Sequence, residues 1–117
     1  MKRDQLNFRN GFRLFVANQH SQSAVMVIPP GSSEGGSDNS HRASDQWLYI
    51  VDGTGVAIVN GRRYMLKPGV IMLIERGDIH ELKATGRKPL KTINIYVPPA
   101  FKDEETPLPA GQPKRRP

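Results

Sequence analysis

The sequence predicts an all-β domain, either a sandwich or a barrel, built from about eight short strands. Apolar residues occur in short runs that are rich in β-branched and aromatic side chains. Glycine, proline, asparagine and aspartate separate these runs, and none keeps a helical period over roughly 11 residues. At 117 residues the chain is expected to form one domain with its own core.

The expected strands follow the apolar runs in order. They cover residues 12–17, 23–28, 46–51, 55–59, 63–66, 70–74, 80–84 and 91–97. Asn60-Gly61 joins two of them and is the preferred pair for a type I′ hairpin turn, which needs positive φ at both central residues. Residues 29–40 form a long loop by composition, and long loops in compact domains are often functional.

Both ends of the chain are expected to lie outside the domain. Residues 1–11 are predicted to be a flexible N-terminus, residues 12–100 the domain, and residues 101–117 a proline-rich, basic, disordered tail. The last 12 residues contain four prolines, which cannot donate to a strand ladder, and little apolar area. Truncation from about Thr106 is therefore expected to leave the fold intact.

Composition excludes several classes of function. The net charge of +6 is spread along the chain, and no aromatic residues alternate with the basic ones, so nucleic-acid binding is disfavoured. There is no cysteine, hence no disulfide or thiol chemistry. No apolar run approaches the roughly 18 residues of a membrane helix, and no signal peptide is recognisable, so a cytoplasmic protein is expected.

Two histidines are the candidates for chemistry, because each lies at or just before a predicted strand. Along residues 80–84, His80, Leu82 and Ala84 share one face while Glu81 and Lys83 share the other, which predicts that His80 points inward. An isolated inward histidine is ordinarily a hydrogen-bonded core or pocket residue. His20, in a turn between strands, is expected at the surface.

The spacing around His41 and His80 resembles the two motifs of the cupin superfamily. The second motif corresponds to Gly69, five residues, Glu75-Arg76-Gly77, two residues and His80, without the usual proline and final asparagine. The first corresponds to Asn39-Ser40-His41, four residues, Gln46, six residues and Gly53, with Ser33 where a glycine is usual. A rival alignment makes His41 the first histidine of the motif and Ala43 the second, but it shortens the spacer before Gln46.

The resemblance covers residues 12–100 and implies a jelly-roll β-barrel, also called a double-stranded β-helix. In such cupins three histidines and a glutamate hold one divalent ion at the barrel mouth. The implied metal ligands here are His41, Gln46 and His80, with Asn39 in the place of the remaining histidine. The ion would be Zn, Fe, Ni or Mn, held more weakly because glutamine carries no charge, and no organic cofactor is implied. The alternative is a neutral polar floor that hydrogen-bonds a ligand or water.

Two functions remain open at this point. The first is a metal-dependent enzyme, by resemblance a dioxygenase, isomerase or lyase, acting on a small organic molecule. The second is a sugar- or carboxylate-binding cupin without turnover. Tyr96 is a candidate ligand-binding residue that could instead pack beneath the tail. Trp47, Tyr49 and Val51 are expected to face outward with part of residues 70–74, which predicts a homodimer unless the N-terminal strand covers them.

Overall fold

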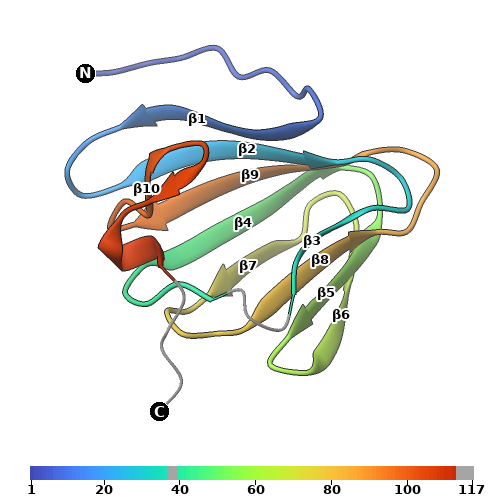
Figure 1. Cartoon of the computed structure of the whole chain (residues 1–117). Helices are drawn as coiled ribbons and strands as arrows, with labels where there is room; N and C mark the ends of the chain where they lie inside the picture. Colours follow the sequence, from blue (N-terminus) through green and yellow to red (C-terminus); the bar gives the residue numbers. More distant parts are fainter. Residues whose placement is uncertain (37–39, 113–117) are drawn as a thin grey trace.

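The computed structural model describes residues 1–36 and 40–112, and these fold into two facing antiparallel sheets (Figure 1). The elements are β1 (Gly11–Ala17), β2 (Gln22–Ile28), β3 (Ser33–Gly35), β4 (Asp45–Asp52), β5 (Gly55–Val59), β6 (Arg62–Leu66), β7 (Ile71–Ile74), β8 (His80–Ala84), β9 (Leu90–Val97), β10 (Phe101–Asp103), β11 (Thr106–Pro107) and the 3₁₀ helix η1 (Pro109–Gly111). One sheet has the order β1-β2-β9-β4-β7 and the other β3-β8-β5-β6, while β10 and β11 form a small ribbon. In the described part of the chain, no helix has the length and apolar character needed to cross a membrane.

The eight predicted strands are all present, with their ends shifted by no more than one residue. The hairpin between β5 and β6 has the expected turn, since Asn60 has φ 50° and Gly61 has φ 82°. One short strand was not predicted: β3 lies inside the expected long loop and pairs with β8, with Glu34 opposite Leu82. Its exposed, glycine-flanked sequence carries no apolar alternation that would indicate a strand.

The C-terminal region departs from the expectation of an unpacked tail. Residues 101–112 form β10, β11 and η1, and they are attached to the body of the domain by side-chain and loop contacts. The Gln22 Oε1 atom accepts hydrogen bonds from the backbone nitrogens of Ala100 and Phe101, both at 3.0 Å. Pro107 itself lies in β11 opposite Phe101, so the prolines prevent neither this short ribbon nor its packing. Residues 113–117 lie outside the described part.

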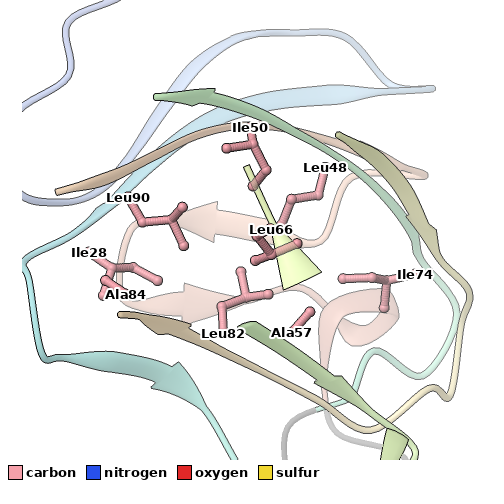
Figure 2. Close-up of a cluster of buried hydrophobic side chains, with 9 residues drawn as sticks. All are labelled: Ile28, Leu48, Ile50, Ala57, Leu66, Ile74, Leu82, Ala84 and Leu90. Atoms are coloured by element: carbon pink, nitrogen blue, oxygen red, sulfur yellow. The ribbon is translucent and has the colours of Figure 1, made fainter. Parts of the chain in front are cut away.

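The core lies between the sheets and fills one half of the barrel. Figure 2 shows its side chains pointing toward one another from both sheets. They are Ile28, Leu48, Ile50, Ala57, Leu66, Ile74, Leu82, Ala84 and Leu90. Further along the same inward faces the residues become polar: Gln46 precedes Leu48 on β4, and His80 precedes Leu82 on β8. The strands therefore build a dry core at one end of the barrel and a polar chamber at the other.

The outer face of the five-stranded sheet carries large apolar side chains in contact with solvent. Trp47 and Tyr49 of β4 are 44% and 41% exposed, and they stand opposite Leu73 and Ile71 of β7 in the strand register. Ile71 is 64% exposed. Exposed apolar side chains that are neighbours across two strands form a patch of the kind that commonly marks an interaction surface.

Candidate metal and ligand site

The polar chamber is a cavity of about 680 Å³, large enough for a small organic molecule. Its walls come from β1, β2, β3, β4, β8, β9 and β10. The lining residues are Phe12, Met26, Glu34, Gly35, Gly36, His41, Gln46, His80, Leu82, Tyr96, Phe101 and Glu104. The predicted residues His41, Gln46, His80 and Tyr96 thus line one cavity, whereas Asn39 lies outside the described residues.

The two histidines come from different parts of the barrel and meet in the cavity. His41 is 6% exposed in the loop before β4, and His80 is 4% exposed at the start of β8. Their ring centroids are 5.2 Å apart. The backbone oxygen of His41 accepts a hydrogen bond from the Gly77 nitrogen at 2.7 Å, which ties the loop of one histidine to the turn that precedes the other.

That turn fixes the position of His80. The Asp78 carboxylate accepts from the Glu75 backbone nitrogen and from Asn60 Nδ2, both at 2.9 Å, and Asn60 Oδ1 accepts from the Ile79 nitrogen at 2.9 Å. The Nδ1 atom of His80 lies 3.1 Å from the Asp78 backbone oxygen, so Nδ1 carries the proton that is donated there. Burial lowers the pKa of His80 below its ordinary value, which outweighs this hydrogen bond and favours the neutral ring.

Asp45 at the start of β4 faces away from the cavity, as strand alternation predicts. Its carboxylate accepts from the backbone nitrogen of Arg76 at 2.9 Å and from Arg76 Nε at 3.2 Å. These hydrogen bonds from Arg76 lower the pKa of Asp45. Asp45 is therefore not a ligand; it connects the strand that carries Gln46 to the turn that carries His80.

A chain of hydrogen bonds behind the cavity determines which way the Gln46 amide points. The Met26 carbonyl can only accept, so the Thr92 hydroxyl donates to it, at 2.8 Å. Thr92 Oγ1 then accepts from Asn94 Nδ2 at 2.9 Å, and Asn94 Oδ1 accepts from Gln46 Nε2 at 2.8 Å. Since its nitrogen is used here, Gln46 presents its oxygen toward His41.

His41 faces an acceptor at each ring nitrogen. Its Nδ1 atom lies 3.1 Å from the Gly111 carbonyl oxygen, and its Nε2 atom lies 3.2 Å from Gln46 Oε1. A neutral ring that donates from Nδ1 has a lone pair on Nε2, so two acceptor atoms then face each other. The other tautomer donates from Nε2 to Gln46 and leaves the Nδ1 lone pair facing the Gly111 carbonyl, so one ring proton serves only one of the two acceptors. A cation at Nε2 serves the Gln46 oxygen while Nδ1 donates to Gly111.

The Nε2–Oε1 separation fits a shared metal ion. Two ligand atoms about 2.0–2.2 Å from one ion, at tetrahedral or octahedral angles, are about 2.8–3.6 Å apart. In the described residues, no group of three or more His, Cys, Asp or Glu is arranged to hold a metal. A metal bound here would therefore have three ligands among the described residues: the rings of His41 and His80 and the amide oxygen of Gln46.

An aromatic wall faces the polar atoms. Phe101 contacts Phe12 with ring centroids 4.9 Å apart and Tyr96 with centroids 5.2 Å apart, and Tyr96 also contacts the His41 ring at 5.5 Å. Burial raises the pKa of Tyr96, so its hydroxyl stays protonated. Tyr96 is thus a wall residue of the cavity, with the C-terminal residue Phe101 packed on it.

Sequence reasoning missed four polar residues at this site. Thr92 and Asn94 share the inward face of β9 with Tyr96, so strand alternation could have indicated two buried polar groups. Glu34 was hidden in a segment with loop composition, and Glu104 in a segment expected to be disordered.

Comparison with known proteins defines the class of protein to which this barrel and chamber belong. Residues 24–96 match the family described as "Cupin domain", and the chain belongs to this family. A solved structure, BH2720 from Bacillus halodurans, superimposes with a TM-score of 0.71 at 27% identity, covering 82% of this chain and 76% of that one.

Two curated relatives match in sequence. The tetracenomycin polyketide synthase protein TcmJ of Streptomyces glaucescens is 29% identical over 77 residues, which are 66% of this chain and 50% of the relative. The L-ectoine synthase of Bordetella avium is 38% identical over 53 residues, which are 45% of this chain and 39% of the relative. The chain therefore spans half or less of the length of these curated relatives.

Proposed function

We propose that this cupin is a metal-dependent enzyme acting on a small organic molecule bound in the chamber. His41, Gln46 and His80 hold a divalent ion in this proposal. When bound, such an ion polarises an oxygen of the bound molecule and lowers the pKa of a coordinated water. The family resemblance implies a dioxygenase, isomerase or lyase, and the two curated relatives bear the names of a polyketide synthase protein and a synthase.

One observation carries the proposal: His41 Nε2 lies 3.2 Å from Gln46 Oε1, and the tautomer that donates from Nδ1 to Gly111 turns the Nε2 lone pair toward that oxygen. The Gln46 oxygen is held there by the chain through Asn94 and Thr92 to a backbone carbonyl. Both histidines also turn Nδ1 toward a backbone carbonyl, which is how proteins commonly orient metal-binding imidazoles that coordinate through Nε2.

The remaining groups of the chamber suit the binding and orientation of a ligand. Phe12, Leu82 and Phe101 give apolar walls that exclude water from the body of a ligand. The protonated Tyr96 hydroxyl is a hydrogen-bond donor at the wall. These residues bind and orient the molecule, while both ring nitrogens of His80 are used, Nδ1 toward the Asp78 carbonyl and Nε2 toward the ion.

The alternative is a binding protein without a metal, and two features favour it. Gln46 lacks the charge of the glutamate found in metal-binding cupins, so the described ligand set is neutral. A His41 ring protonated at both nitrogens would also satisfy Gly111 and Gln46 by donating to each. Nitrogen NMR of the histidine rings distinguishes the two cases, because a ring that carries two protons has no lone pair for a metal.

The decisive experiment combines elemental analysis of the purified protein with calorimetric titration of the metal-free protein. We expect about one divalent ion per chain, and we expect His41→Ala and His80→Ala to lose it. His20→Ala is the matched control, because it also removes one histidine but lies on the surface. A parent protein that binds no divalent ion by either method would exclude the enzyme proposal and favour the alternative.

A further inference from the structure

We infer that the molecule bound in the chamber carries an organic ammonium group, which the mouth of the cavity recognises. This inference rests on the proposed use of the chamber as a ligand site. It comes from the charge of the lining residues, from the aromatic wall and from one hydroxyl that opens into the cavity.

The charged groups at the cavity are carboxylates, although the chain as a whole has a net charge of +6. Glu34 of β3 and Glu104 at the end of β10 both line the cavity, and neither lysine nor arginine lines it in the described part of the chain. The Glu104 carboxylate is held in place by the backbone nitrogen of Leu14, which donates to Oε2 at 2.8 Å. Within residues 1–36 and 40–112, neither glutamate forms an ion pair. An anionic ligand would be repelled here, and a cationic one attracted.

The aromatic wall adds a second preference for a cation. Phe12, Tyr96 and Phe101 form a mutually packed group of rings on one side of the cavity. The face of an aromatic ring attracts an ammonium group by about 0.5–1 kcal/mol at exposed sites and by more where water is excluded. A neutral ligand of the same shape gains the packing but not this attraction.

The Tyr96 hydroxyl is the third observation. Tyr96 is 3% exposed and lines the cavity, and its hydroxyl forms no hydrogen bond with the described residues. This oxygen is not among the buried side-chain atoms without a partner in the described residues, so it opens into the cavity, where a group on the ligand can hydrogen-bond it. Its oxygen can accept from an ammonium N–H or from a ligand hydroxyl such as that of choline, and burial keeps it protonated and uncharged.

The test uses choline and its neutral carbon isostere, 3,3-dimethylbutan-1-ol, as probes. The two molecules have the same shape and the same hydroxyl, and the quaternary nitrogen cannot coordinate a metal. Titration of the full chain at low ionic strength should show choline binding about fivefold more tightly or better. The preference should fall as salt is added, because salt screens the carboxylates.

Variants connect the preference to the mouth of the cavity. Glu34→Gln and Glu104→Gln should each weaken choline about twofold to fivefold and leave the isostere unchanged. The amide introduced by Glu104→Gln keeps an oxygen that accepts from Leu14, so the loop geometry is retained. Glu105→Gln is the matched control, because it removes the same charge from the adjacent, exposed position that does not line the cavity. If Glu105→Gln lowers choline affinity as much as Glu104→Gln does, the assignment of the ammonium site to the cavity mouth is overturned.

Two further outcomes would overturn the inference: equal or tighter binding of the isostere, and no choline binding at about 50 mM. Metal titration of the same samples keeps the two proposals apart. A choline preference in a protein that binds no metal would end the enzyme proposal and leave this inference standing. Metal binding without a choline preference would end this inference and leave the enzyme proposal standing.

Discussion

Removal of the C-terminal residues 108–117 should weaken both the fold and the metal site, although the sequence suggests a dispensable tail. Three hydrogen bonds join this segment to the loop that carries His41. They run from Arg42 N to Gln112 O at 2.7 Å, from Ala43 N to Ala110 O at 2.9 Å, and between His41 Nδ1 and Gly111 O at 3.1 Å. A chain that ends at Pro107 loses all three.

The size of the effect follows from these contacts. At about 0.5–1.5 kcal/mol net for each hydrogen bond, the loss of unfolding free energy is about 1.5–4.5 kcal/mol. For a domain of this length that corresponds to a fall in Tm of about 5–15 °C. Loss of the carbonyl that orients a metal-binding histidine typically costs about 10–100-fold in metal affinity.

Gly111→Ala is a smaller perturbation of the same contact. A Cβ at this position would lie 2.0 Å from the Ala100 backbone oxygen and 2.8 Å from the Ala100 Cβ, so the backbone of the segment must move. Movement of Gly111 shifts the carbonyl oxygen that is hydrogen-bonded to His41 Nδ1. The variant should therefore lower metal affinity in the same direction as the truncation, with the rest of the tail still present.

Thermal unfolding and metal calorimetry on the two variants are the assays. The control is a chain that ends at Pro113, which lacks the three basic residues 114–116 and keeps every contact described above. If the chain that ends at Pro107 melts within about 1 °C of this control and binds metal equally well, the segment does not position His41, and the reasoning fails.

Three further predictions test the site and the outer surface. Gln46→Glu should raise affinity for a divalent ion in calorimetry, because it restores an anionic ligand, while lowering Tm; equal or weaker metal binding would remove Gln46 from the ligand set. In metal-free protein the lowered pKa of His80 makes the unfolded chain bind more protons, so unfolding free energy should fall as pH drops below about 6.5 and stay level above it. His80→Gln should flatten that dependence in thermal melts and His20→Gln should not. We also propose that the outer apolar patch forms a homodimer, so Leu73→Lys should shift light scattering over a dilution series toward monomer, and a monomeric parent at micromolar concentration would refute the dimer.

The strands and the inward direction of His80 could be predicted from the local pattern of side chains. Glu81 and Lys83 share one face of β8, so His80 was expected on the inward face with Leu82. The run 46–51 is apolar on both faces apart from Gln46, so the inward position of Gln46 was implied by the resemblance to the cupin motif, and alternation then places Asp45 and Trp47 on the opposite face. The Asn60-Gly61 turn was equally predictable, because few other residues adopt positive φ twice in succession.

The parts that were missed depend on contacts between distant segments. The β10, β11 and η1 elements pack because Gln22, 79 residues before Phe101, supplies hydrogen-bond partners to that backbone. Nothing in a proline-rich sequence indicates such a partner. Glu34 of β3 and Glu104, in the turn after β10, line the same cavity, and this follows from the order of strands in space rather than from any spacing in the chain.

The hydrogen-bond chain gives the neutral Gln46 a role of its own in this barrel. Its Nε2 atom donates to Asn94 Oδ1, and Asn94 in turn must donate to Thr92, because the Thr92 hydroxyl is committed to the Met26 carbonyl. A glutamate at position 46 would turn a second acceptor toward Asn94 Oδ1 inside a buried site, and an unsatisfied buried group costs about 1–3 kcal/mol. The amide and the β9 residues behind it are therefore matched. Affinity at the proposed metal site is therefore coupled to the stability of the fold through Asn94, and a stronger site without a loss of stability requires the network and the ligand to change together.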